Sequence, residues 1–91
     1  MTDKTDDELI LHLRISVASK VIWEGEATSI SSENSNGKFD ILGMHSNFIT
    51  LVQDHPILVI QKNGTKIEYV FKESVILVTD NIVKIFANIG D

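Results

Sequence analysis

The chain has 91 residues, of which 43% are hydrophobic, and it contains no cysteine. These totals allow one domain with one small core, and they exclude a disulfide scaffold, a thiolate zinc site and a cysteine nucleophile. The net charge is −5, and the 8 basic residues are scattered singly along the chain. Because phosphate binding needs clustered lysines and arginines, the composition argues against a nucleic-acid partner.

The first eight residues are polar and acidic, so we expect residues 1–8 to form a disordered tail and residues 9–91 to form the domain. This N-terminus has neither the basic stretch nor the apolar stretch of a secretory signal peptide. No apolar run is long enough to cross a bilayer. The sequence therefore predicts a soluble, cytoplasmic protein.

Short strands separated by turn-forming residues are predicted along the whole domain. Apolar and polar residues alternate from residue 9 to residue 17, which is typical of a half-buried strand. Serine, asparagine and glycine dominate residues 31–37, which predicts the clearest loop of the chain. The other expected strands are segments 21–23, 27–30, 39–42, 48–52, 57–61, 66–71, 75–79 and 82–87.

Two dipeptides predict tight hairpins in the second half of the chain. Asn63-Gly64 joins two strand-like segments and is the stronger signal, and Asp80-Asn81 joins the last two. No segment keeps a helical period over ten residues. The chain is therefore predicted to be all-β, a sandwich or a barrel.

Three of the predicted strands are apolar on both sides: segments 57–60, 75–78 and 82–86. They could be central strands packed between two layers of the fold. Alternatively, a partner protein could cover one face of a sheet, because a small sandwich buries only one face of each sheet in its own core. We favour the partner.

No pattern of catalytic or metal-binding residues is found. His12, His45 and His55 are isolated, and none has a second ligand at metal-site spacing. Glu24 and Glu26 would lie on the same side of a strand, where a solvated face is expected rather than an acid–base pair. The sequence predicts no catalytic residue, no metal and no cofactor.

Several motifs in order resemble one known family. They are Trp23-Glu24-Gly25-Glu26, then Gly37-Lys38-Phe39-Asp40-Ile41-Leu42-Gly43-Met44-His45, then Asn63-Gly64, then the closing strand pair at 75–87 around Asn81. Together they resemble the N-terminal domain of the epsilon subunit of F-type ATP synthases, which is called delta in mitochondria. The match runs over residues 9–87.

The resemblance implies a flattened antiparallel β-sandwich of about eight to ten short strands. It also implies a central-stalk subunit that contacts the gamma subunit and the membrane c-ring and performs no chemistry itself. Such a subunit would be cytoplasmic and peripheral to the inner (plasma) membrane through other subunits only. The implied c-ring-facing loop lies within residues 37–47 and includes Lys38, Gly43, Met44, His45 and Ser46. The implied gamma-facing residues are Val17, Ala18, Ile76 and Val78.

The sequence departs from the family pattern in this loop and at its C-terminus. Gly43-Met44 stands where Pro-Gly is usual, and Lys38 replaces an acidic residue. The chain stops at Asp91, so the resemblance implies a short form without the C-terminal helical hairpin. These departures leave a second hypothesis open, a stand-alone interaction or assembly module of the same fold. A third, a carbohydrate- or ligand-binding sandwich using Trp23 and Tyr69, rests on fold analogy alone.

Overall fold

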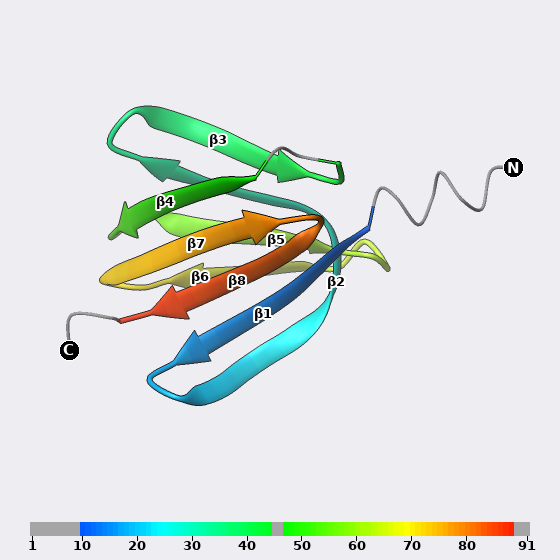
Figure 1. The fold of residues 1–91 in the computed structure, drawn as a ribbon, viewed down its shortest axis with the longest axis horizontal. Helices are drawn as coiled ribbons and strands as arrows, with labels where there is room; N and C mark the ends of the chain where they lie inside the picture. The colour runs from blue at the N-terminus through cyan, green and yellow to red at the C-terminus, as the bar shows by residue number, and fades with distance from the viewer. Residues whose placement is uncertain (1–9, 45–46, 89–91) are drawn as a thin grey trace, which may run out of the picture.

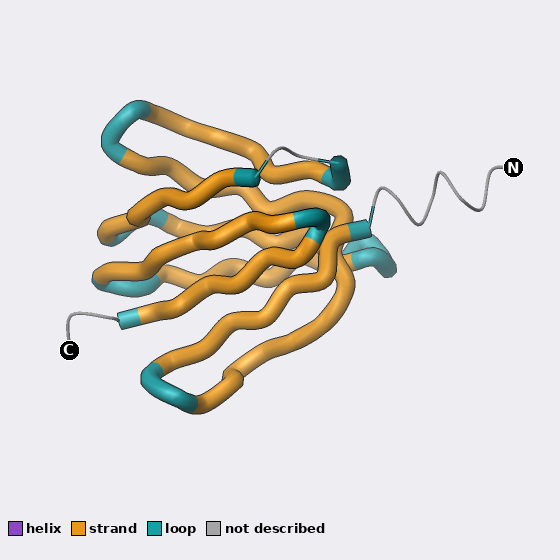
Figure 2. Tube along the Cα trace, in the orientation of Figure 1, coloured by secondary structure: helices purple, strands orange, loops and turns teal. Residues whose placement is uncertain are grey.

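The computed structural model describes residues 10–44 and 47–88, which form eight strands and no helix (Figures 1 and 2). The predicted all-β fold is confirmed, whereas the predicted tail at residues 1–8 lies outside the described residues. The strands are β1 (Leu11–Val17), β2 (Lys20–Asn34), β3 (Gly37–Leu42), β4 (Phe48–Gln53), β5 (Pro56–Gln61), β6 (Lys66–Val70), β7 (Glu73–Thr79) and β8 (Ile82–Ala87).

The strands form two layers that share β2. The order of hydrogen-bonded neighbours is β4-β7-β8-β1-β2-β5-β6, with β3 also paired to β2. The first part of β2 pairs with β1, and its second part pairs with β3 and β5. We call β4-β7-β8-β1 with the start of β2 the first sheet, and β3, the end of β2, β5 and β6 the second sheet. The two sheets face each other in a flattened sandwich measuring 46 × 28 × 22 Å (Figure 1).

One strand pair departs from the predicted antiparallel arrangement. β1 and β8 run parallel, with Leu13 opposite Val83 and Ile15 opposite Ile85, whereas the other strand pairs are antiparallel. The alternation of apolar residues in β1 and β8 determines which side of each strand is buried. It carries no information on strand direction, so this pair could not be read from the sequence.

The long strand β2 corrects two further predictions. It is one 15-residue strand where two short strands were expected, and residues 31–34 belong to it rather than to a loop. The connection to β3 shrinks to Ser35 and Asn36, with the Asn36 backbone N–H donating to Asn34 Oδ1 at 2.8 Å. Serine and asparagine favour turns, but backbone pairing of β2 with neighbours on both sides outweighs that preference here.

Both predicted hairpins are confirmed. Gly64 has a φ of 92°, and the backbone N–H of Thr65 donates to Asn63 Oδ1 at 2.9 Å. Asp80 and Asn81 form the turn between β7 and β8 with φ values of 51° and 64°. Two successive positive φ values are the geometry of the type I′ turn, which matches the twist of the strands it connects.

The core lies between the two sheets and is aliphatic. The inward residues of β1, β7 and β8 pack against those of β2, β3 and β5. Partly buried aromatic side chains pack against the edges of this core. Phe39 contacts Phe48 edge to face at a centroid distance of 5.5 Å, and Tyr69 stacks on Phe71 at the same distance. The buried members are Leu11, Leu13, Ile15, Ala27, Ile30, Ile41, Val52, Ile57, Val59, Ile76, Val78, Val83 and Ile85.

Ser74 places a hydroxyl in this core without a hydrogen-bond partner among the described residues. A buried donor left unpaired costs about 1–3 kcal/mol. We therefore expect Ser74→Ala to raise the free energy of unfolding by about 1 kcal/mol in a urea titration.

Ser32 is the matched control for this prediction. It is also buried, but its Oγ donates to the carbonyl oxygen of Pro56 at 2.8 Å. Ser32→Ala should therefore lower the free energy of unfolding by about 1 kcal/mol. Equal losses in both variants would show that the Ser74 hydroxyl is paired in solution.

Candidate interaction surfaces

The outer side of the first sheet carries apolar residues that the fold leaves uncovered. Exposed apolar side chains of β4 and β8 flank half-buried ones of β7, and cross-strand pairing sets them in adjacent rows. We call this the β7/β8 face. It consists of Ile49 (67% exposed), Leu51, Val75, Leu77, Ile82 and Phe86 (40% exposed). A contiguous apolar face of this kind on a small domain is a mark of a protein–protein contact.

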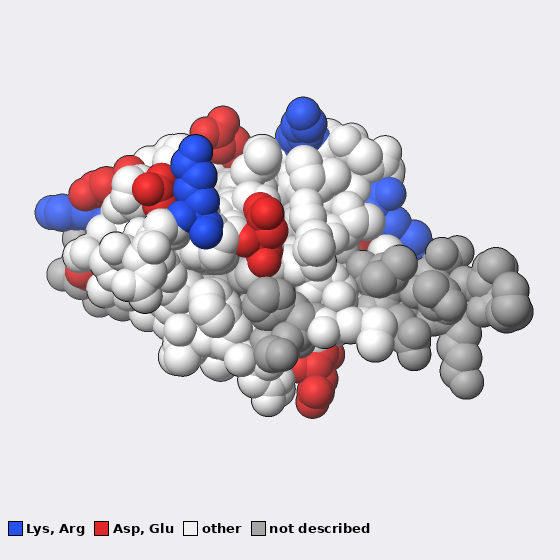
Figure 3. Space-filling model, turned by 90° about the horizontal axis from the view of Figure 1, so that it is seen from above, with Lys and Arg blue, Asp and Glu red and all other residues white. Residues whose placement is uncertain are grey.

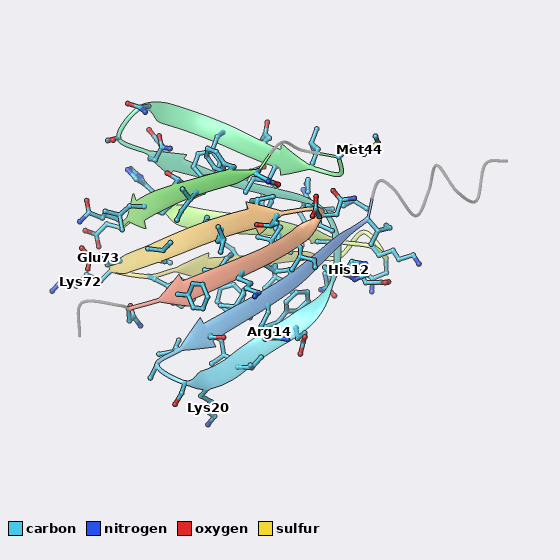
Figure 4. All side chains as sticks on the ribbon, viewed as in Figure 1. His12, Arg14, Lys20, Met44, Lys72 and Glu73 are labelled. Atoms are coloured by element: carbon cyan, nitrogen blue, oxygen red, sulfur yellow. The ribbon has the colours of Figure 1, made fainter. Side chains whose placement is uncertain are left out.

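Towards β1 and β2 the same side becomes charged. Arg14 Nε donates to Glu24 Oε2 at 3.4 Å, and His12 Nδ1 lies 3.9 Å from Glu26 Oε2. Lys62 Nζ lies 3.6 Å from the other carboxylate oxygen of Glu26. His12 and Arg14 point outward one after the other along β1 (Figure 4), so these exposed polar and charged side chains form a polar border to the β7/β8 face.

The outer side of the second sheet is more mixed. Charged residues of β3 and β6 interrupt its apolar ones, and Ser31 Oγ donates to Asp40 Oδ1 at 2.5 Å. Figure 3, seen from the β3 side, shows acidic and basic side chains interspersed without a block of one sign. Its outward residues include Lys38, Asp40, Leu42, Leu58, Lys66, Glu68 and Val70.

A second exposed feature is the connection after β3, which the β7–β8 turn holds in place. The Met44 backbone N–H donates to Asn81 Oδ1 at 2.7 Å, and the Asp80 N–H donates to Asn47 Oδ1 at 3.4 Å. The carbonyl oxygen of Asn81 also accepts the His12 N–H at 2.8 Å. Met44 itself is 66% exposed, at the end of the sandwich away from Lys72 and Glu73 (Figure 4). We call this region the Met44 end.

Replacing Asn81 should loosen the Met44 end without unfolding the turn. Asn81→Gly keeps a residue that tolerates positive φ but removes the acceptor for the Met44 N–H. One hydrogen bond contributes about 1 kcal/mol, so exchange of the Met44 amide hydrogen should accelerate about fivefold in NMR hydrogen exchange.

Asn81→Asp is the control, because the carboxylate retains an acceptor oxygen at this position. Exchange at Met44 should stay within about twofold of the original rate in this variant. Unchanged exchange in Asn81→Gly would show that the side chain of Asn81 does not hold the connection.

The structure separates the residues implied to face a c-ring. Gly43 and Met44 lie in the connection after β3, while His45 and Ser46 lie outside the described residues. Lys38 lies within β3 itself, opposite Glu33 and next to the β2–β3 turn. Because a strand advances about 3.4 Å per residue, Lys38 stands at the other end of β3 from Met44.

Two of the residues implied to face gamma are buried in the core, which corrects that expectation. Ile76 is 0% and Val78 is 1% exposed, so neither can contact another chain in this fold. The outward residues of β7 are Val75 and Leu77. Since β7 is apolar on both sides, its sequence does not reveal which set points inward. Val17 is half-buried and Ala18 is exposed at the β1–β2 turn.

The described residues contain no cluster of three or more histidine, cysteine or carboxylate side chains that could hold a metal ion. No helix capable of crossing a membrane occurs among residues 10–44 and 47–88.

Comparison with known proteins gives a family match and two structural likenesses. Residues 10–89 match the model of the ATP synthase delta/epsilon chain β-sandwich domain. A chain of the Euglena gracilis mitochondrial ATP synthase OSCP/F1/c-ring structure is similar with a TM-score of 0.77 and 19% identity, over 85% of this chain and 49% of that one. A comparison with curated protein sequences finds no match.

A chain of the Tetrahymena thermophila mitochondrial ATP synthase central stalk/c-ring structure is similar with a TM-score of 0.69 and 11% identity. The match covers 85% of this chain and 62% of that one. The present chain thus spans less than two thirds of the length of either solved chain. At these identities the likeness establishes the fold.

Proposed function

Because this chain belongs to the family of ATP synthase delta/epsilon β-sandwich domains, we propose that it is a non-catalytic central-stalk subunit that links the gamma subunit to the c-ring. The observation that carries the proposal is the β7/β8 face, whose apolar side chains need a covering partner. The similar solved chains come from assemblies described as F1/c-ring and central stalk/c-ring, which supports these partners.

The gamma contact is proposed to lie on the β7/β8 face. On β7 the proposed contact residues are the outward Val75 and Leu77, because Ile76 and Val78 are buried in the core. Ala18 and Val17 extend the contact towards the β1–β2 turn. A partner surface of ordinary size would bury about 1,200–2,000 Å² in total.

The c-ring contact is proposed to lie at the Met44 end. Gly43 and Met44, with His45 and Ser46 after them in the chain, would meet the ring, and the exposed thioether of Met44 suits an adaptable apolar contact. Lys38 is left out of this contact because it lies at the opposite end of β3. Attachment to the inner (plasma) membrane would then come only through the other subunits.

Co-expression with the gamma subunit from the same organism tests the proposal. The expected result is a 1:1 complex that survives gel filtration at micromolar concentration. Separate elution of the two proteins would refute the gamma contact. It would favour the second candidate, a free-standing interaction module. The presence of Gly43-Met44 where Pro-Gly is usual supports that candidate.

A further inference from the structure

Lys84 stands at the centre of the outer side of the first sheet. It points outward from β8 between Ile82 and Phe86, which flank it on the same side of the strand. Across the strands its neighbours are Leu77 on β7 and Arg14 on β1. A partner that covers the β7/β8 face therefore covers the ammonium group of Lys84 as well.

Lys84 has no ion-pair partner among residues 10–44 and 47–88, although Asp80 lines one of the hollows beside it. Arg14 is paired with Glu24, and Glu26 lies near both His12 and Lys62. Burying an ammonium group without a counter-charge is costly. An apolar partner surface over Lys84 would therefore lose binding free energy.

Two shallow hollows adjoin Lys84, and both are lined by Lys84 and Ile82. The hollow towards β2 has a volume of about 350 Å³ and is also lined by His12, Arg14, Glu24 and Glu26. The hollow towards β7 has a volume of about 250 Å³ and is also lined by Leu77, Thr79 and Asp80. Each can receive a side chain of a partner, and the first places that side chain between two cations of adjacent strands, Lys84 and Arg14.

We propose that Lys84 pairs with an aspartate or glutamate of the chain that covers the β7/β8 face, seated in the hollow between Lys84 and Arg14. The inference rests on the proposed function, in which that chain is the gamma subunit. Glu24 and Glu26 line the same hollow, but each already has a cation beside it, with Arg14 Nε 3.4 Å from Glu24 and Lys62 Nζ 3.6 Å from Glu26. Lys84 thus favours a partner with an acidic side chain at this point, since a carboxylate compensates the buried ammonium.

The test compares the gamma affinity of Lys84→Met, Lys84→Glu and Lys66→Met, measured by calorimetry. Lys84→Met leaves the gamma carboxylate unpaired and should weaken binding about 30-fold, and Lys84→Glu should weaken it further. Lys66 lies exposed on β6 of the second sheet, so Lys66→Met should leave the affinity within about twofold. Replacing the opposed gamma carboxylate by lysine should restore binding to Lys84→Glu.

The measurement distinguishes a failure of the Lys84 pairing from a failure of the proposed function. If Lys84→Met binds gamma as tightly as the original chain or more tightly, the acidic pairing is overturned while the gamma contact stands. If the original chain itself does not bind gamma, the proposed function fails instead. All three variants should keep their melting temperature, because both lysines are exposed and take part in no ion pair among the described residues.

Discussion

Phe86→Asp should abolish stable binding of the gamma subunit while the domain stays folded. Phe86 is an outward residue of β8, 40% exposed, and lies opposite Val75 of β7 on the β7/β8 face. Replacing the aromatic ring by a carboxylate removes apolar contact and adds the cost of taking a charged group out of water. We expect the dissociation constant to rise about 100-fold or more in calorimetry.

Val70→Asp provides the control for Phe86→Asp. Val70 is also an exposed apolar strand residue, 61% exposed, but it points outward from β6 on the second sheet. Its substitution should change the gamma affinity by less than about threefold. If Val70→Asp abolishes binding and Phe86→Asp does not, the gamma contact lies on the second sheet.

Ile85→Ala should cost the domain about half of its stability. Ile85 is fully buried, and its neighbours across the strands are Ile76 on β7 and Ile15 on β1. Truncating such a side chain leaves a cavity and lowers the free energy of unfolding by about 2–5 kcal/mol. A domain of this size has only about 5–14 kcal/mol in total, so the urea midpoint should fall sharply.

Ile82→Ala tests the same strand on its other side. Ile82 is 48% exposed and lies outside the core. Its truncation should lower the free energy of unfolding by less than about 1 kcal/mol. A larger loss in Ile82→Ala than in Ile85→Ala would mean that the inward and outward sides of β8 are assigned the wrong way round.

The two proposed contacts meet at one turn. Asp80 and Asn81 connect β7 to β8, the strands that carry most of the gamma-facing surface, and they also hold the Met44 connection and the start of β1. A load applied at the Met44 end would therefore pass through the side-chain hydrogen bonds of Asn81 and Asn47, and through the His12 N–H bond to the Asn81 carbonyl oxygen, into the first sheet. A continuous hydrogen-bonded sheet of this kind suits the proposed role in the central stalk.

Much of the local structure follows from the sequence alone. The alternation in β1 places Leu11, Leu13 and Ile15 inside, and the Asn63-Gly64 and Asp80-Asn81 dipeptides supply the two tight hairpins. These features depend on neighbouring residues, because turn geometry and side-chain alternation are local properties of the chain. The family resemblance, carried by ordered short motifs, is confirmed by the family match over residues 10–89.

The tertiary structure alone decided the parallel pairing of β1 with β8, the sharing of β2 between the two sheets and the inward side of β7. Local patterns do not determine strand direction or partner, and a strand that is apolar on both sides fits either way round. The same holds for Lys38, which is close to Met44 in sequence but lies at the other end of β3. In each case long-range backbone pairing and burial of the core settle what residues near in sequence leave open.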